Sequence, residues 1–486
     1  MTTIADLKVY DDIFVGGRWQ PSTSSQFIEV VNPATEEVWA RVPDADAADI
    51  DAAVSAAHEA FVGTGWSDIG AAARAVIIER FADELAARGE AMAAVITREN
   101  GTPLTETSAA ASHSAGILRY FTGLAHTVDA EDTRPFPNAS GSFTTVRRQP
   151  VGVCALIAPW NFPLTLVMVK LAPALVAGCT VVIKPASETP LDLRVLVEAA
   201  VAAGIPDGVI NVVTGSREAG ALLVQHPLVA KVAFTGSTEA GQIIAAQCGT
   251  LLRPVTLELG GKSASIVLPD ADLDYFASML NRTCLRNTGQ TCYNSTRILA
   301  PRSRYSEVVD LVASTVAATK QGDPLDPATV YGPSASARQR DRVESYIAIG
   351  KAEGATVATG GGRPQGLDRG FYVQPTVFSD VASGMRIAQE EIFGPVLVVI
   401  PFDDDADAAR IANDSRFGLG GSIFSSDDSR ALALAEKIDT GSIGINFFGS
   451  NHAAPFGGWK DSGMGVEYGP EGLNAYLRLK SIHRRG

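Results

Sequence analysis

Apolar and polar residues alternate along residues 13–40, around Gly16-Gly17 and Asn32-Pro33, and this pattern predicts short strands and hairpins. Residues 44–61 and 71–97 instead carry an apolar residue every three or four positions, which predicts helices. From residue 151 the apolar runs 151–159, 179–185 and 208–215 are separated by helical stretches 164–176 and 191–203. Strands and helices that alternate in this way indicate a parallel sheet.

The alternation continues to the end of the chain. The strand KVAFTGS precedes a helix for which Ser237 is the predicted N-cap and Gly249 the predicted stop, and the strand VTLELGG follows. A second series begins after Lys262, with strands at 263–269, 297–301, 371–378 and 395–402 and a long helical region that reaches Arg297. We therefore expect an α/β fold with a second α/β domain that starts near Gly260-Gly261.

Three segments need a separate interpretation. Residues 163–183 are the longest apolar run, but Lys170 and Pro173 interrupt it, so it is expected to form a buried helix and a strand rather than a membrane span. The strip 129–149 and the tail 475–486 are too short and too polar to form cores of their own. They are expected to pair with each other or with a second subunit.

Composition narrows the classes of partner. A length of 486 residues suggests two to four domains, and a net charge of −14 argues against nucleic acid and anionic membranes as partners. The acidic segment 1–12 lacks the features of a secretory signal. Five irregularly spaced cysteines are typical of free thiols in a reducing cytoplasm, and six scattered histidines predict no catalytic metal.

Two residues are candidates for covalent and acid-base chemistry. Cys292 follows a glycine in GQTCYNSTR, outside the apolar strands, although a free cysteine more often packs as a small hydrophobic residue. Glu258 ends an apolar strand in LELGG, where burial would raise its pKa toward that of a general base; a surface-facing strand residue is the alternative. The adjacent GGKS is not a phosphate-binding loop, because Thr256 stands where that loop requires glycine.

Two further motifs suggest binding groups. Asn161 lies between two aromatic residues and two prolines in PWNFP, a rigid setting in which its amide could hold a developing oxyanion; a turn residue is the alternative. In FTGS, Gly236 and Ser237 stand at a strand-to-helix turn, where free N–H groups attract phosphate. The GxGxxG pattern is absent.

The motifs PWNFP, KPAS, FTGS, LELGGKS, GQTC, EEIFGP and PFGG occur in one order that resembles the aldehyde dehydrogenase superfamily over nearly the whole chain. The resemblance implies a hydrolytic, non-acylating enzyme that oxidises an aldehyde to its carboxylic acid. In the mechanism that the resemblance implies, Cys292 attacks the aldehyde, and Asn161 with the Cys292 N–H holds the oxygen of the thiohemiacetal. Glu258 then activates the water that hydrolyses the thioester.

The resemblance also implies NAD or NADP as cofactor. Trp160 and Ser237 would lie at the pyrophosphate, Lys184 at the adenosine ribose, and Glu391 with Phe393 at the nicotinamide. The full set of implied cofactor residues is Ile157, Ala158, Pro159, Trp160, Lys184, Ser187, Gly215, Phe234, Gly236, Ser237, Leu259, Gly260, Glu391 and Phe393. Ser187 stands where NAD-preferring relatives often carry glutamate, so NADP use is expected beside NAD; the neighbouring Glu188 opposes this expectation.

Lys170 and Glu467 match positions suggested to relay protons from the general base, with an ordinary buried ion pair as the alternative. The residues expected to line the substrate entrance are Phe162, Arg286, Tyr293, Phe448 and Phe456. Arg286 would favour an aldehyde that carries a carboxylate, with pairing to a structural acid as the alternative. The aromatic residues, with Phe447, would favour aliphatic or aromatic aldehydes.

By the same resemblance the fold contains two Rossmann-like doubly wound domains and a small β arm. The expected boundaries are 1–128 with 150–258 for the NAD(P)-binding domain, 259–465 for the catalytic domain, and 129–149 with 475–486 for an oligomerisation arm in a homodimer or homotetramer. A coenzyme A-acylating relative, an inactive structural or binding homologue, and a cysteine hydrolase that uses Cys292 and His452 remain as alternative functions.

Overall fold

A mostly parallel sheet organises the first part of the chain. The computed structural model describes residues 7–63, 65–139 and 141–485, so the first six residues of the acidic segment 1–12 lie outside the described residues. Within the described ranges the sheet has eight strands, in the spatial order β22 (Gly463–Met464), β12 (Val255–Glu258), β11 (Val229–Thr235), β8 (Val153–Ile157), β9 (Thr180–Lys184), β10 (Ile210–Val212), β2 (Asp12–Val15) and β3 (Arg18–Pro21). The strands from β12 to β10 are parallel, and the order in which the chain adds strands reverses between β8 and β11. This is a doubly wound sheet.

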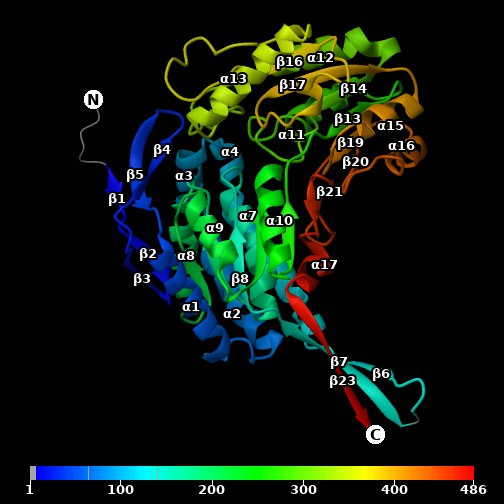
Figure 1. The fold of residues 1–486 in the computed structure, drawn as a ribbon. Helices are drawn as coiled ribbons and strands as arrows, with labels where there is room; N and C mark the ends of the chain where they lie inside the picture. The colour runs from blue at the N-terminus through cyan, green and yellow to red at the C-terminus, as the bar shows by residue number, and fades with distance from the viewer. Residues whose placement is uncertain (1–6, 64, 140, 486) are drawn as a thin grey trace.

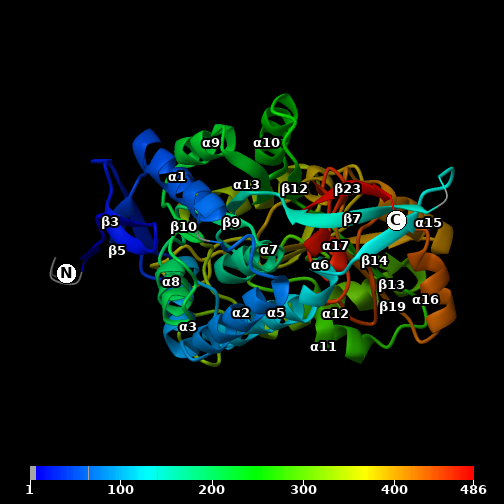
Figure 2. The same ribbon diagram turned by 90° about the horizontal axis from the view of Figure 1, so that it is seen from below.

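Helices cover both faces of this sheet (Figure 2). Those on one face are α2 (Ala71–Ala86), α3 (Gly89–Asn100), α5 (Ala110–Gly123), α7 (Pro163–Ala177) and α8 (Asp192–Ala202), and those on the other are α1 (Ala47–Gly63), α9 (Arg217–Gln225) and α10 (Thr238–Thr250). Each layer buries its own apolar cluster against the strands, with Leu171 and Ala199 in the first cluster and Val54 and Leu223 in the second.

The second sheet repeats the plan. Its order is β15 (Thr356–Thr359), β16 (Thr376–Ser379), β17 (Val396–Phe402), β14 (Arg297–Pro301), β13 (Ala264–Val267), β19 (Gly421–Phe424) and β20 (Gly444–Ile445). The helices around it are α11 (Leu273–Thr283), α12 (Tyr305–Ala318), α13 (Ala337–Ala352), α14 (Arg386–Gln389), α15 (Asp405–Asn413) and α16 (Asp428–Ala435). All strands from β16 to β20 are parallel and the order reverses at β13, which confirms the predicted α/β class with two Rossmann-like sheets.

Smaller elements complete the chain. The short helices are α4 (Leu104–Thr107), α6 (Ala125–Val128) and α17 (Gly469–Asn474). Two small sheets combine β1 (Lys8–Val9), β5 (Glu37–Pro43) and β4 (Phe27–Asn32), and β18 (Phe417–Gly418) with β21 (Trp459–Lys460).

The two polar strips that lacked cores of their own pair with each other. Strand β7 (Ser142–Pro150) lies between β6 (Asp132–Pro135) and the C-terminal strand β23 (Leu477–Arg485) in an antiparallel sheet. This arm projects from the body below α17, and its outer end is well separated from both large sheets (Figure 1). Leu479 on β23 is 70% exposed, so the arm presents apolar surface to its surroundings.

The long apolar run folds as expected. Helix α7 begins with Pro163 at its first turn and ends at Gly178, which has a φ of 94°, and β9 follows directly. Thirteen of the fifteen α7 residues are buried, Lys170 and Pro173 among them. No helix within the described residues combines the length and the apolar character needed to cross a membrane.

The boundaries that differ from the sequence-based expectation include those of three helical regions. The Oγ atom of Ser237 caps α10 by accepting a hydrogen bond from the N–H of Ala240, as predicted, but the helix runs one residue beyond Gly249. The predicted helical stretch 71–97 forms two helices, because the first helix ends at Ala86 and a second one begins at Gly89. The helical region predicted to reach Arg297 is wrong: α11 ends at Thr283, and the following segment is a loop that carries Cys292.

Candidate active site

The Cys292 loop has an irregular backbone that tertiary contacts stabilise. Asn287 and Thr288 adopt left-handed φ angles of 51° and 55°, which non-glycine residues rarely do, and Gly289 follows with 77°. A methyl group on Gly289 would overlap the carbonyl oxygen of Gly394, so the loop approaches another segment too closely for a larger residue. This backbone cannot continue α11, and it turns Cys292 toward the end of β12.

Cys292 and Glu258 meet at the centre of the site. Glu258 is the last residue of β12 and is almost fully buried, and its Oε2 atom lies 3.7 Å from the Sγ atom of Cys292, which donates a hydrogen bond to it. Burial raises the pKa of both groups well above their ordinary ranges; the Glu258 carboxylate adds to the effect on the thiol. The pair therefore retains a proton that Glu258 can take up when the thiol reacts.

The side chain of Asn161 lies beside the same loop. Its Nδ2 atom donates a hydrogen bond to the carbonyl oxygen of Gln290 at 3.0 Å. Asn100 and Asn287 donate to the backbone carbonyl groups of Trp160 and Asn161, respectively, both at 3.0 Å. An amide has two N–H groups, and only one of those of Asn161 has an acceptor among the described residues, so the other can donate to a further group.

Lys170 and Glu467 form a buried ion pair behind Glu258. The Nζ atom of Lys170 lies 2.6 Å from Oε1 of Glu467 and 2.6 Å from Oγ1 of Thr235. Lys170 is completely buried in α7, and Glu467 follows the short strand β22 that pairs with β12. The charge of Lys170 lowers the pKa of Glu258 and the charge of Glu467 raises it, so both partners influence the candidate base.

The residues expected to bind pyrophosphate lie at the carboxyl ends of β8 and β11. This is the point where the strand order of the first sheet reverses, and ligands of such sheets bind there. The N–H of Gly236 donates to the carbonyl oxygen of Glu258, which ties the phosphate turn to the end of β12. A methyl group on Gly236 would collide with the ring of Phe234. Residues Ile157, Ala158, Pro159 and Trp160 leave the end of β8 beside this turn.

Lys184, Ser187 and Gly215 form a group at the other end of the expected cofactor site. Burial lowers the pKa of Lys184 to about 8, and its Nζ atom donates to the carbonyl oxygen of Pro185 at 3.0 Å. The Oγ atom of Ser187 donates to the carbonyl oxygen of Gly215 at 3.3 Å. The carboxylate of Glu188, in contrast, lies 3.2 Å from the guanidinium of Arg338.

Glu391 and Phe393 lie next to the Cys292 loop. The Oε1 atom of Glu391 accepts the N–H of Gly261 at 2.8 Å, and the Phe393 ring packs edge-on against Trp160 at 5.3 Å. Gly260 leaves no room for a Cβ atom beside the Glu391 carboxylate, and a methyl group on Gly261 would overlap the carbonyl oxygen of Cys292. The preceding residue, Leu259, packs over Gly241 of α10.

Aromatic side chains cluster around Tyr293, the residue that follows Cys292. The Tyr293 ring lies 4.9 Å from the ring of Phe448 and 6.3 Å from that of Phe456. The guanidinium of Arg286 lies over the Phe162 ring at 4.9 Å. Phe447, also expected among these aromatic residues, is 55% exposed.

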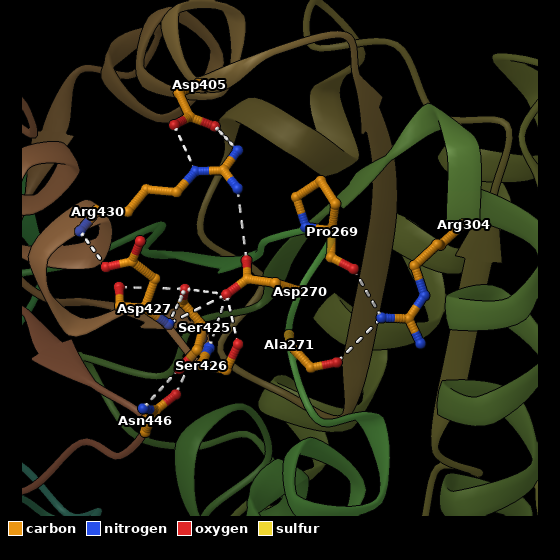
Figure 3. Close-up of polar contacts among 10 residues, drawn as sticks. All are labelled: Pro269, Asp270, Ala271, Arg304, Asp405, Ser425, Ser426, Asp427, Arg430 and Asn446. Carbon is orange, nitrogen blue, oxygen red and sulfur yellow. Dashed lines mark hydrogen bonds and ion pairs between the residues drawn. The ribbon is translucent and has the colours of Figure 1, made fainter.

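The loop with Phe448 and Phe456 starts from a fixed anchor (Figure 3). Asn446, with a left-handed φ of 61°, accepts the N–H of Ser425 and donates to its carbonyl oxygen. The Oγ atom of Ser425 donates to Asp270 at 2.7 Å, and Arg430 lies 3.5 Å from Asp270 and 2.6 Å from Asp405. The ends of β13 and β19 thus determine where this loop begins.

Sequence reasoning missed two residues near Arg286 and His452. Glu106 of α4 lies 3.0 Å from Arg286, and the ring of His113 of α5 lies 4.7 Å from that of His452. Both lie more than 170 positions from Cys292 along the chain and in no recognisable motif. His452 also stacks on Tyr468, whereas the thiol of Cys292 bonds to Glu258, so no cysteine–histidine pair of a hydrolase forms here.

Comparisons with known proteins agree with this geometry. The model of the aldehyde dehydrogenase family matches residues 19–482. Geranial dehydrogenase of Castellaniella defragrans is 50% identical over 98% of this chain and 99% of its own length. A Mycobacterium tuberculosis aldehyde dehydrogenase complexed with NAD⁺ is 45% identical with a TM-score of 0.95, and covers 98% of each chain. A mutant of Pseudomonas syringae aldehyde dehydrogenase C with NAD⁺ and octanal is 41% identical with a TM-score of 0.92, over 97% of this chain and 96% of that one.

The family model spans nearly the whole chain, and the relatives are similar over nearly their full lengths. The two Rossmann-like sheets agree with that match. The chain therefore belongs to the aldehyde dehydrogenase family, and it is an NAD(P)-dependent enzyme that oxidises an aldehyde to its carboxylic acid.

Proposed function

We propose that Cys292 is the nucleophile of this oxidation and Glu258 its general base. The observation that carries the proposal is the hydrogen bond of 3.7 Å from the buried Cys292 thiol to the Glu258 carboxylate. Glu258 takes the thiol proton while sulfur attacks the aldehyde carbon, and the resulting thiohemiacetal is oxidised to a thioester. Glu258 passes this proton toward solvent and then removes a proton from water, which attacks the thioester. The acid is released, and Glu258 returns a proton to the departing Cys292 thiolate.

Asn161 supplies the electrostatic part of the mechanism. The oxygen of the aldehyde becomes negatively charged when sulfur adds to the carbon, and the free N–H of the Asn161 amide stabilises that charge together with the N–H of Cys292. Because Gln290 and Asn287 fix the amide and its backbone, this donor needs little reorganisation during the reaction. Lys170 and Glu467 serve Glu258 as the next groups on a proton path toward solvent.

The chain's own groups fit a nicotinamide dinucleotide. Ser237 caps the N-terminus of α10 at the switch point of the first sheet, and such a helix N-terminus attracts phosphate, although the N–H of Gly236 is already bonded to the carbonyl oxygen of Glu258. Lys184 and Ser187 would hold the adenosine ribose, and Glu391 the nicotinamide ribose. The bound cofactor supplies the hydride acceptor. NADP is accepted beside NAD, because Ser187 is neutral and Glu188 is held by Arg338.

The substrate has an extended apolar body. Tyr293, which follows Cys292, packs with Phe448 and Phe456, and Phe162 packs against Arg286; this ring surface favours hydrocarbon chains. The names of two relatives point the same way, since one is a geranial dehydrogenase and another was crystallised with octanal. We extend these substrates to the present chain as a proposal.

The assembly is a homodimer or homotetramer in the cytoplasm. The exposed apolar residues of β23 and the unpaired edges of the arm support a sheet shared between subunits. Five free cysteines support a reducing compartment. The division into an NAD(P)-binding domain (1–128, 150–258), a catalytic domain (259–465) and an oligomerisation arm (129–149, 475–486) belongs to the same proposal.

An aldehyde panel with NAD and with NADP tests this function, with reduction of the cofactor as the readout and Cys292→Ala as the control. We expect turnover in the wild type only. Activity that survives in Cys292→Ala would remove the nucleophile from the mechanism. Adding coenzyme A tests the acylating alternative, because a product that changes from acid to acyl thioester would favour it; Glu258 beside the thiol favours hydrolysis instead.

A further inference from the structure

Glu106 joins helix α4 to the loop that carries Cys292. Its Oε2 atom lies 3.0 Å from Nε of Arg286, and its Oε1 atom accepts the backbone N–H of Asn287 at 3.1 Å. The side chain of Asn287 in turn donates a hydrogen bond to the carbonyl oxygen of Asn161. A single carboxylate therefore neutralises the arginine and fixes the start of the nucleophile loop.

The other side-chain contacts of Arg286 are with residues that are expected to line the aldehyde site. Its Nη1 atom donates to Oη of Tyr293 at 2.5 Å, and its guanidinium lies over the ring of Phe162. Burial lowers the pKa of this guanidinium, but Tyr293 and Glu106 outweigh burial and leave the pKa above its ordinary range. Arg286 is thus always charged, and its charge already has a partner.

The space beside this pair holds no other positive charge among the described residues that line it. A cavity of about 110 Å³ is bounded by Glu106, Arg286, Phe162, Asn161 and His113, together with small and apolar residues of α3, α5 and α7. Burial, with smaller contributions from His452 and Arg286, lowers the pKa of His113 to about 4, so its ring is neutral near pH 7. The carboxyl groups of Glu258 and Glu391 lie close enough to the Cys292 thiol to raise its pKa.

We propose that Glu106 is a specificity-determining residue: by pairing with Arg286 it makes the wall of the aldehyde site electrically neutral, so that the enzyme selects uncharged apolar aldehydes and rejects aldehydes that carry a carboxylate. This inference rests on the proposed function. A carboxylate on the substrate would be repelled by Glu106 and would find the charge of Arg286 already paired. Without Glu106, the same Arg286 would attract it.

Two single variants should shift selectivity in opposite directions. The quantity to measure is the ratio of kcat/KM for succinic semialdehyde to kcat/KM for butanal, which has the same chain length and no charge. Glu106→Gln frees the charge of Arg286 and should raise the ratio at least about tenfold, through a lower KM for the semialdehyde. Arg286→Met leaves Glu106 unpaired and should lower the ratio by a similar factor.

The double variant Glu106→Gln with Arg286→Met is the matched control, and its ratio should return toward the wild-type value. Damage to the loop alone would reduce both aldehydes equally and leave every ratio unchanged, and that result would overturn the inference. If Glu106→Gln does not fold, Arg286→Met still decides, because a raised or unchanged ratio contradicts the proposal. A wild-type enzyme that reduces neither NAD nor NADP with any aldehyde would refute the proposed function and this inference together, whereas wild-type turnover with unchanged ratios refutes only the inference.

Discussion

The ammonium group of Lys170 lies 2.6 Å from the carboxylate of Glu467, and both are buried behind Glu258. A buried ion pair is weak evidence for added stability, because desolvation costs about as much as the attraction gains. Its position instead gives it an electrostatic effect on the candidate base. That effect leads to a test that separates a proton-path role from a structural one.

The pH dependence of kcat/KM should follow the pKa of the Cys292–Glu258 pair. Burial raises the pKa of both groups, so kcat/KM should rise with pH. The rising limb of the pH profile should lie well above about 4.3, the ordinary pKa of a glutamate side chain. Lys170 lowers the pKa of Glu258, so Lys170→Met should move the limb to higher pH, and Glu467→Gln should move it to lower pH. Rate loss in both variants with an unmoved limb would assign the pair a structural role only.

Removing single catalytic groups should give graded losses. Glu258→Gln should lower kcat by about 10²- to 10⁴-fold, the usual contribution of a general base. Asn161→Ala should lower it by about 10²- to 10³-fold, the cost of one oxyanion donor. Steady-state kinetics with one aldehyde measures both, and binding of NAD to each variant is the control for folding. An Asn161→Ala enzyme with wild-type kcat would exclude the amide from the oxyanion site.

Cofactor preference should depend on residue 187. Ser187→Glu places a carboxylate near the adenosine ribose and should lower kcat/KM for NADP at least about tenfold relative to NAD, because like charges repel. Ser187→Gln introduces a side chain of nearly the same size as glutamate but without its charge, and this variant should keep NADP activity. Strict use of NAD by the wild type would contradict the expectation.

The arm should control assembly. Leu479 and Ile482 of β23 are exposed, and replacing both with aspartate should prevent a shared sheet and give monomers. Size-exclusion chromatography with light scattering measures the mass, and circular dichroism checks that the monomer remains folded. A monomeric wild type, or a variant of unchanged mass, would refute the role of the arm.

A second buried carboxyl group outside the active site should affect stability. Asp192 lies beside Glu99, and burial raises its pKa to about 8. The folded state binds the Asp192 proton more tightly than the unfolded state does. The resulting stabilisation of the fold is complete below about pH 4 and is lost as the pH rises through about 8. Asp192→Asn should therefore lose less Tm between pH 6 and pH 9 than the wild type, and an equal loss would rule this group out.

The sequence predicted the strands and most helices near the site because each carries a local signal. Ser237 caps α10 as its position before the helix suggested, and the interrupted apolar run folded as α7 and β9. The helix expected to reach Arg297 failed, because the left-handed backbone at Asn287 and Thr288 is stabilised by tertiary contacts rather than by residue preference. The same contacts explain why Glu106 was missed: it meets Arg286 across 180 positions.

The most direct test of the central claim is to trap the thioester. Glu258→Gln should be mixed with octanal and NAD or NADP, quenched in acid and examined by intact-protein and peptide mass spectrometry. We predict an acyl group on Cys292, with the mass of the aldehyde less two hydrogens, and no adduct in Cys292→Ala. Cofactor reduction without an adduct on Cys292, or an adduct on another residue, would contradict it.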